Sequence, residues 1–479
     1  MFQDMLDCAK PAAELLKKQE KVLLVSHIDA DGISAAGIAS IVLGRLEISH
    51  DVLFLKSVDP EGAEEIRKRN LFTWLTDLGS GSLSLLEGVE GIITDHHIPE
   101  TASCTPSPEE RGNILAYGKN ESIKCDLVQV NPHLCGHDGT SEISGAGAAF
   151  VLAMAVDESN RDLASLAIVG ALGDMQDQSY RGLIGLNRDI LEIGQKAGVV
   201  EPEEDLRFFG RESRGLPKFL MYASDPSLPG LSSERSAVAL LSKTGIKLQN
   251  SRGWYRVWTD LYEDEKEAVI SALKEHLIAK GKVEEAENLL GEVYSLPCED
   301  KGSGFYDGKE FSTMLNSCGR YDRADLGLLL AKGDRGGALR EARGLRKGHR
   351  KNLVTSLQVM REMGVNELSH LFWVDVGDKI RDTVVGTVAG MYLKDIKGKK
   401  PILALAKGDV GKSKASIRGN QQMVDNGLDL SAVMKKACVV VNGEGGGHKI
   451  AAGATIPAGT EKAFVEAVNA ALAEQEEGM

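Results

Sequence analysis

Short apolar runs alternate with longer amphipathic stretches over the first 190 residues of the chain. The runs have the length of buried strands and occupy residues 22–26, 52–55, 72–75, 91–94 and 127–130. Other stretches carry apolar residues at helical spacing, at 32–43, 145–156 and 163–172. Short buried strands that alternate with helices predict an α/β domain built on a doubly wound parallel sheet.

The pattern changes after residue 190. Residues 264–290 are charged and amphipathic, with Val269, Leu273 and Leu277 at i,i+4 spacing, which predicts a largely helical insertion. Alternation returns near residue 370, with strands expected at 371–376 and 402–406, helices at 383–393, 428–437 and 461–474, and a glycine-rich loop at 443–447. We therefore expect three parts, 1–190, 191–369 and 370–479, of which the last is a smaller α/β domain.

Composition narrows the class of protein. At 479 residues, with 42% hydrophobic and 26% charged residues, the chain is expected to form two to four folded domains. No apolar run reaches the roughly 20 residues of a membrane helix, and residues 1–20 lack the order of a signal peptide. The seven cysteines are scattered and never form a C-x-x-C pair, which favours a reducing cytoplasm without disulfides or a zinc site.

Carboxylates and imidazoles follow the predicted strands in a fixed order. They are His27, Asp29 and Asp31, then Asp77, then Asp95, His96 and His97, and finally Asp174. The carboxyl ends of parallel strands share one edge of a sheet, so we expect these groups to converge there. Carboxylate oxygens suit magnesium and manganese, an added imidazole favours manganese, and a pair of such ions indicates hydrolysis of a phosphate ester.

Each group has a predicted role. Asp77 is the expected bridging ligand, His96 the imidazole ligand, and Asp174 completes the site. Asp95 is expected to orient a histidine, while His97 faces the phosphate as a donor or general acid. Taken alone, Asp-x-Asp-Gly is most often a turn or helix cap, and a histidine pair is most often structural. The ordered set at strand ends carries the prediction.

Two further segments suggest contacts with phosphate. Gly445, Gly446 and Gly447 precede His448 and lack the lysine of a Walker motif, so they form either a flexible turn or a cradle of backbone amides. Ser416 and Arg418 are plausible neighbours. A basic run fits a solvated helix face and a nucleic-acid track about equally well; it comprises Arg335, Arg340, Arg343, Arg346, Lys347, Arg350 and Lys351.

The net charge of −14 weakens a nucleic-acid function without excluding it, because bound cations would neutralise the clustered acids. Aromatic residues make up only 5% of the chain, so backbone contacts should dominate over base stacking. Trp254 and Tyr321 are the stacking candidates.

The complete motif set resembles the DHH phosphoesterase superfamily, and its C-terminal glycine segment, followed by Ala451-Ala452-Gly453, resembles the DHH-associated domain. Within the superfamily the chain is most similar to archaeal RecJ-like exonucleases. The resemblance implies two manganese ions, with magnesium as the alternative. It also implies that Asp29, Asp31, Asp77, His96 and Asp174 are ligands, and that substrate binds in a cleft between the two α/β domains. Other branches carry a ligand histidine where this chain has Val25, and His27 is the candidate substitute.

The expected function is processive hydrolysis of single-stranded DNA or RNA to mononucleotides in replication or repair. Some relatives bind the GINS replication complex, so GINS is a candidate partner; the sequence does not fix the oligomeric state. Two alternatives stay open. One is a phosphoesterase for short oligonucleotides, bisphosphorylated nucleosides or cyclic dinucleotides, and the other is a non-catalytic replication scaffold.

Overall fold

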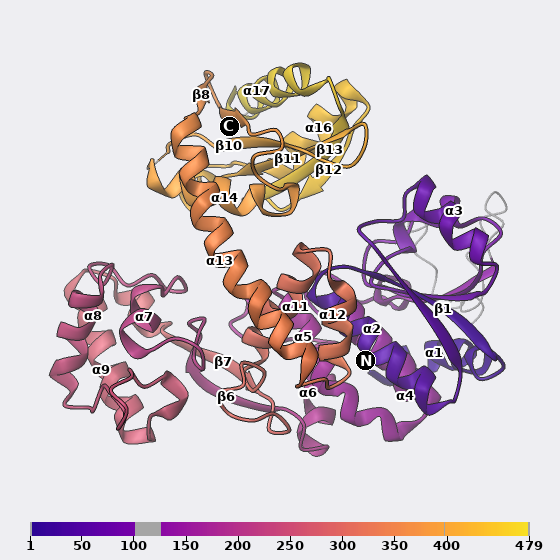
Figure 1. The fold of residues 1–479 in the computed structure, drawn as a ribbon, viewed down its shortest axis with the longest axis horizontal. Helices are drawn as coiled ribbons and strands as arrows, with labels where there is room; N and C mark the ends of the chain where they lie inside the picture. The colour runs from indigo at the N-terminus through magenta and orange to yellow at the C-terminus, as the bar shows by residue number, and fades with distance from the viewer. Residues whose placement is uncertain (1, 101–125, 397, 478–479) are drawn as a thin grey trace. The chain divides into compact units, whose positions relative to one another are not determined.

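The computed structural model of the chain describes residues 2–100, 126–396 and 398–477 (Figure 1). The chain forms two compact units, Met1–Ala342 and Arg343–Met479. The long helix α13 (Gly337–Met363) contains the boundary between them.

The first unit contains the predicted parallel sheet. Its strands lie in the order β2-β1-β3-β4-β5, and every neighbouring pair is parallel. The strands are β1 (Lys21–His27), β2 (Ser49–Leu55), β3 (Phe72–Thr76), β4 (Glu90–Thr94) and β5 (Asp126–Val130). The α/β fold class expected from the sequence is therefore confirmed.

Helices cover both faces of this sheet. On one face, α3 (Pro60–Arg69) and the 3-10 segment Ser80–Leu86 bury Leu23, Val25 and Leu75 in a shared apolar cluster. Helices α1 (Phe2–Leu16), α2 (Ala30–Arg45) and α4 (Gly145–Val156) pack against the other face. An outer layer contacts α2; it consists of α5 (Ala164–Gly173), α11 (Gly308–Arg320) and α12 (Ala324–Ala331).

The middle region is largely helical, as expected, but it also contains a two-stranded sheet that the sequence did not predict. Strands β6 (Glu201–Leu206) and β7 (Leu290–Ser295) pair antiparallel. The β6 sequence EPEEDL has four acids and a proline, which disfavour a strand, so pairing with its distant partner β7 makes it one. The helices are α6 (Leu186–Lys196), α7 (Leu216–Met221), α8 (Glu234–Leu241), α9 (Glu263–Ala279) and α10 (Val283–Glu287).

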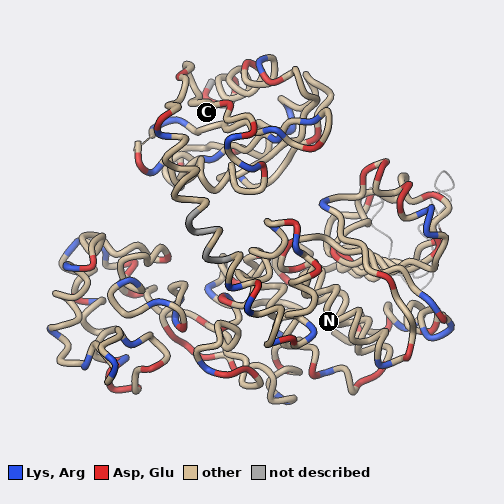
Figure 2. The backbone as a smooth tube through the Cα atoms, in the orientation of Figure 1, with Lys and Arg blue, Asp and Glu red and all other residues tan. Residues whose placement is uncertain are grey.

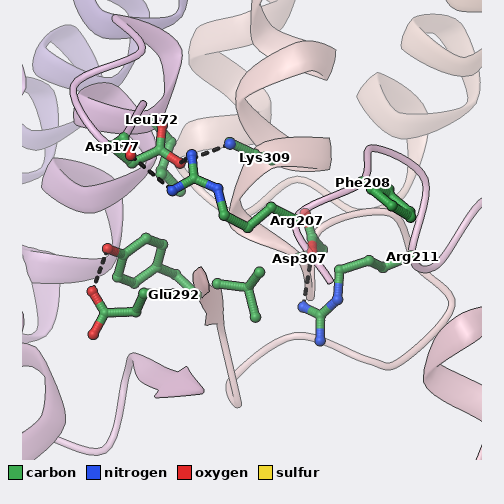
Figure 3. A pocket seen from close by; sticks show the side chains of 10 residues that line it. Leu172, Asp177, Arg207, Phe208, Arg211, Glu292, Asp307 and Lys309 are labelled. Atoms are coloured by element: carbon green, nitrogen blue, oxygen red, sulfur yellow. Dashed lines mark hydrogen bonds and ion pairs between the residues drawn. The ribbon is translucent and has the colours of Figure 1, made fainter. Parts of the chain in front are cut away.

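A buried ionic network fastens the middle region to the sheet domain (Figure 3). The guanidinium of Arg207 donates to the carboxylate and the carbonyl of Asp177 at 2.9 Å, and Lys309 reaches the same carboxylate at 2.7 Å. Arg211 contacts Asp205 and Asp307 nearby. Removing one member would leave the opposite charge buried without a partner, which costs free energy. The network therefore holds Arg207 of the middle region against Asp177 of the sheet domain.

The second unit holds a six-stranded mixed sheet in the order β12-β13-β11-β10-β9-β8. Its strands are β8 (Asn366–Glu367), β9 (Phe372–Asp375), β10 (Ile402–Lys407), β11 (Lys412–Arg418), β12 (Glu444–Gly447) and β13 (Ala451–Pro457). Its helices after α13 are α14 (Asp382–Asp395), α15 (Gln421–Asp425), α16 (Leu430–Val441) and α17 (Glu461–Glu477).

The predicted glycine-rich loop at 443–447 is wrong, because most of it is edge strand β12, paired with β13. Glycine is a poor strand former, but side chains here would collide with neighbours. A Cβ on Gly445 would lie 2.6 Å from the Cys438 sulfur, and Gly447 has a φ of +136°. Close packing against α16 therefore requires glycine in this strand.

Charged side chains and cysteine thiols are spread along the described part of the chain. Acidic and basic positions are interspersed along both units (Figure 2). The cysteines at 8, 135, 298, 318 and 438 are free thiols, whereas Cys104 and Cys125 lie outside the described residues. Across the described ranges, no helix combines the length and the hydrophobicity needed to cross a membrane.

Candidate metal centre

The candidate ligands meet at the point where the sheet changes winding direction. In the order β2-β1-β3-β4-β5, the chain places β2 on one side of β1 and then crosses to place β3, β4 and β5 on the other side, so the switch point lies between β1 and β3. Such a switch point opens a crevice at the carboxyl ends of the two central strands. Strand β1 ends at His27, β3 ends directly before Asp77, and β4 ends directly before Asp95.

One group of possible ligands consists of His27, Asp29 and Asp77. The Nδ1 atom of His27 lies 3.1 Å from Oδ2 of Asp29 and 3.5 Å from Oδ2 of Asp77. Asp29 also caps α2, because its Oδ1 accepts the Gly32 N–H at 2.9 Å. This cap leaves Oδ2 of Asp29 directed at the imidazole.

A second group shares Asp77 and adds His96 and His97. The Nε2 atom of His96 lies 3.3 Å from Oδ1 of Asp77 and 3.8 Å from Oδ2 of Asp31. The Nδ1 atom of His96 is 2.7 Å from the Gly139 carbonyl, which can only accept a hydrogen bond. The hydrogen therefore sits on Nδ1, and Nε2 is the nitrogen available for a metal.

Asp77 is the one residue common to both groups, so its two oxygens face different sets of ligands. It adopts a left-handed backbone conformation with a φ of +59°, which is uncommon for a residue with a side chain. A Cβ on Gly145 would lie 2.5 Å from Oδ1 of Asp77, so glycine lets the start of α4 approach the carboxylate. This position is the one that a bridging carboxylate requires.

Asp31 and Asp174 lie beside the second group. Both oxygens of Asp31 accept backbone N–H groups at the start of α4, from Gly145 at 2.7 Å and Ala146 at 3.0 Å. Oδ2 of Asp174 lies 3.9 Å from Nδ1 of His96. The structure thus brings all six sequence-predicted ligands into one cluster.

Asp95 orients His97 and not His96. Its Oδ1 lies 2.7 Å from Nδ1 of His97, and its Oδ2 accepts the Ser80 N–H at 3.0 Å. Burial acts to raise the pKa of Asp95, but the hydrogen bond from His97 and further contacts outweigh it and lower that pKa to about 2. An ionised Asp95 holds the His97 ring, whose side chain is 57% exposed, and the hydrogen bond raises the His97 pKa.

The cluster retains protons when no cation is present. Burial, opposed by the His96 charge, raises the pKa of Asp174 to about 6, and burial also raises the pKa of Asp31. Burial lowers the pKa of His96, but the carboxylates, Asp77 foremost, outweigh it and raise that pKa well above 6.5. Bound cations would take the place of these protons.

The residues present fit a pair of divalent cations. Nδ1 of His27 and Oδ1 of Asp77 are among the buried side-chain atoms that have no hydrogen-bond partner within the described residues. Buried polar atoms normally have partners, and these two lie in the two ligand groups. The donor set of carboxylate oxygens and imidazole nitrogens suits manganese, with magnesium as the harder alternative.

Three neighbours of the cluster were not placed there from the sequence, although Asn316 and Arg320 were candidate nucleic-acid contacts. Gln176 donates from Nε2 to Oδ2 of Asp174 at 3.1 Å and to the Gly139 carbonyl at 3.0 Å. From α11, Oδ1 of Asn316 accepts the Ala30 N–H at 2.9 Å. Arg320 follows one turn later, with no hydrogen bond or ion pair to any described residue. The Asn316-x-x-Gly319-Arg320 spacing was the available signal, but nothing local connects it to a loop 286 residues earlier.

The C-terminal candidates gather on the sheet of the second unit. The registers place Ser416 opposite Gly453, Arg418 opposite Ala451 and Gly446 opposite Gly453. Arg418 lines a pocket together with Lys394, Lys399 and Asn420. Exposed His448 follows β12, and its backbone N–H donates to the Ala451 carbonyl.

The basic run lies mostly on α13, so its predicted helical spacing is present. Arg335, however, pairs with Glu299 at 2.8 Å and lies over the Phe305 ring. It supports the fold and is not part of an open basic face. The side chains of Arg346, Lys347, Arg350 and Lys351 lie outside the described part of the chain.

Comparison with known proteins matches two regions of the chain to protein-family models. A DHH-CID domain model matches residues 208–290, and a DHHA1 domain model matches residues 368–474. An uncharacterized protein of Methanocaldococcus jannaschii is 27% identical over 470 residues, which cover 96% of this chain and 95% of that protein.

Two solved structures share the fold. RecJ of Thermus thermophilus in complex with manganese has a TM-score of 0.55 at 18% identity; the match covers 98% of this chain but 55% of RecJ, so the chain spans about half of that protein. CDC45 of Entamoeba histolytica has a TM-score of 0.61 at 11% identity, with 98% of both chains covered. At these identities the likeness concerns the fold.

Proposed function

We propose that this chain, which belongs to the DHH phosphoesterase superfamily and carries a DHHA1 domain, is a metal-dependent exonuclease that hydrolyses single-stranded DNA or RNA. One observation carries the proposal: two groups of histidine and aspartate ligands share Asp77 at the switch point of a parallel sheet. A solved structure of exonuclease RecJ bound to manganese, which shares this fold at a TM-score of 0.54 and 18% identity, supports manganese as the cofactor and nucleic acid as the substrate class.

The chain's own residues have separable roles in this reaction. His27, Asp29, Asp31, Asp77, His96 and Asp174 would hold two divalent cations, which supply the charge that activates water and neutralises the phosphate. His97, held by Asp95, offers an exposed imidazolium as a phosphate donor or general acid. Arg320 adds a guanidinium beside Asp29.

In the C-terminal unit, we assign phosphate binding to Ser416, Arg418, Gly445, Gly446, Gly447 and His448. Arg418 borders a pocket with two lysines, and the glycines of β12 expose backbone amides at a sheet edge. Backbone amides and a guanidinium fork are suited to phosphate oxygens.

The test is digestion of 5′- and 3′-labelled single-stranded DNA and RNA with manganese, in parallel with Asp77→Asn. Asparagine tolerates the left-handed backbone of residue 77 and removes only the charge. We expect activity to fall by roughly a thousandfold or more, as it does when a principal group of an active site is lost. Asp162→Asn is the matched control, because that exposed aspartate pairs with Arg45 on the surface.

Each outcome decides between functions. Release of mononucleotides by the wild type and by Asp162→Asn, but not by Asp77→Asn, supports the exonuclease, and the label released first gives its polarity. Cleavage of dinucleotides while long strands survive would favour the small-substrate phosphoesterase. No cleavage with any metal would favour the replication scaffold, and GINS binding stays a separate prediction for a pull-down with the purified complex.

A further inference from the structure

A hairpin of the middle region, residues 247–256, presents a fixed and exposed tryptophan. The Arg256 N–H donates to the Leu248 carbonyl, and the Asn250 N–H donates to the Trp254 carbonyl, both at 2.9 Å. Oδ1 of Asn250 also accepts the N–H groups of Arg252 and Trp254 at 3.0 and 3.1 Å. These bonds fix the tip of the hairpin around Trp254.

Arg256 anchors the base of the hairpin. It donates two hydrogen bonds of 2.6 Å to the Glu265 carboxylate on α9 and further bonds to the carbonyls of Lys247 and Asp260. Trp254 is nevertheless 71% exposed, whereas Trp74 and Trp258 are fully buried. An ordered loop therefore holds a large aromatic ring in solvent.

The hairpin and the residues directly before and after it, 241–259, carry only positively charged side chains. Residues 241–259 contain Lys243, Lys247, Arg252 and Arg256 and no carboxylate, in a chain whose net charge is −14. Glu265 neutralises Arg256. The other three cations are exposed and have no ion pair within the described ranges. An anionic ligand is the complement of this surface.

We propose that this hairpin binds single-stranded nucleic acid, with Trp254 stacked on a base and Lys243, Lys247 and Arg252 facing phosphates. Unpaired bases offer π-faces to an aromatic ring without sequence preference, and duplex bases do not. Polar and charged residues, Asn250, Ser251 and Arg252, precede Trp254 in the hairpin, whereas large apolar patches are the mark of many protein-docking surfaces. The inference rests on the proposed function, since it adds a second contact for the same substrate class.

The experiment measures binding of a fifteen-nucleotide oligothymidylate in EDTA, so that no cleavage occurs. Trp254 is the most exposed tryptophan, and we expect the oligonucleotide to quench its fluorescence. Trp254→Ala should weaken binding about 5- to 100-fold, the usual range for loss of one stacked base. Tyr262→Ala is the matched control, because Tyr262 is 75% exposed in the same region but is followed by acidic Glu263 and Asp264.

The salt dependence tests the cations separately. Replacing Lys243, Lys247 and Arg252 by glutamine should lower the slope of log affinity against log salt by about 2, at roughly 0.7 per phosphate contact. Unchanged affinity in Trp254→Ala and an unchanged slope in the triple variant would overturn the inference and leave the nuclease proposal intact. Hairpin-dependent binding without cleavage in manganese would support the inference and overturn the nuclease.

Discussion

Gln176 links two metal-ligand positions through a single amide group. Its Nε2 donates to Asp174 and to the Gly139 carbonyl, which itself fixes the tautomer of His96. Its Oε1 accepts a hydrogen bond of 2.6 Å from buried Asn187. Groups that orient metal ligands contribute to affinity without touching the ion.

Replacing Gln176 by methionine should therefore weaken manganese binding about 10- to 100-fold, because the side chain keeps its size but loses these hydrogen bonds. Isothermal titration with manganese well below the unfolding temperature gives the affinity. Gln178→Met is the matched control, since Gln178 is exposed two residues away. Equal manganese affinities in both variants would show that Gln176 has only a structural role.

Arg320 has the properties of a substrate contact. Desolvation by the surrounding protein lowers its pKa, and charge interactions with Tyr321 and Asp29 partly oppose this effect, but an arginine stays protonated at neutral pH. A charged group held near the candidate ligands without a partner can receive a phosphate. We expect Arg320→Gln to lower kcat/KM about 10- to 100-fold and to leave manganese affinity unchanged. A parallel loss of manganese affinity in titrations would instead assign Arg320 to the metal centre.

Helix α11 reaches the loop after β1 through a glycine. A Cβ on Gly319 would lie 1.8 Å from the Ile28 carbonyl oxygen, so any larger residue must push the helix away. Gly319→Ala should destabilise the fold by about 1–3 kcal/mol and weaken manganese binding, because Asn316 would lose its bond to Ala30. Gly344→Ala, a helical glycine with open space around it, should slightly raise the unfolding temperature. Thermal denaturation and manganese titration of both variants test this contact.

Local sequence patterns predicted the buried strands of the parallel sheet best, because each of these strands is a short apolar run. The strands that end before Asp77 and Asp95 follow from short apolar runs, and their shared edge follows from parallel pairing. Strand β6 and edge strand β12 were missed because their residues disfavour strands and partners decide their conformation.

Contacts between distant elements were also beyond the sequence. The hydrogen bond between Ala30 and Asn316 joins residues that are 286 positions apart, and no pattern in either segment predicts it. The same holds for Gln176, whose Nε2 donates hydrogen bonds to the carbonyls of Gly139 and Ile143 more than 30 residues earlier in the chain. The limits predicted at residues 190 and 369 stay predictions, since the two compact units divide at residue 342.

For the molecule as a whole, the protonated cluster couples stability to pH. The pKa values of Asp31, Asp174, His27 and His96 are all raised in the folded protein, so the folded state binds more protons than the unfolded state. Stability then falls as pH rises. For Asp174 the loss spans pH 3.8 to about 6, and for the histidines it continues upward from 6.5. Asp29 and Asp95, whose pKa values are lowered, act oppositely but only below about pH 4.

We therefore expect the metal-free protein to lose roughly 5 °C in unfolding temperature between pH 5 and 8. Manganese should reverse the trend, because it binds the deprotonated ligands and its stabilisation grows as protons leave. Thermal denaturation at several pH values, with and without manganese, gives both slopes. Asp77→Asn lacks the carboxylate shared by both ligand groups. In this variant the unfolding temperature should depend less on pH, both with and without manganese. A manganese effect independent of pH from 5.5 to 8 would mean that the ion binds away from these proton-holding ligands.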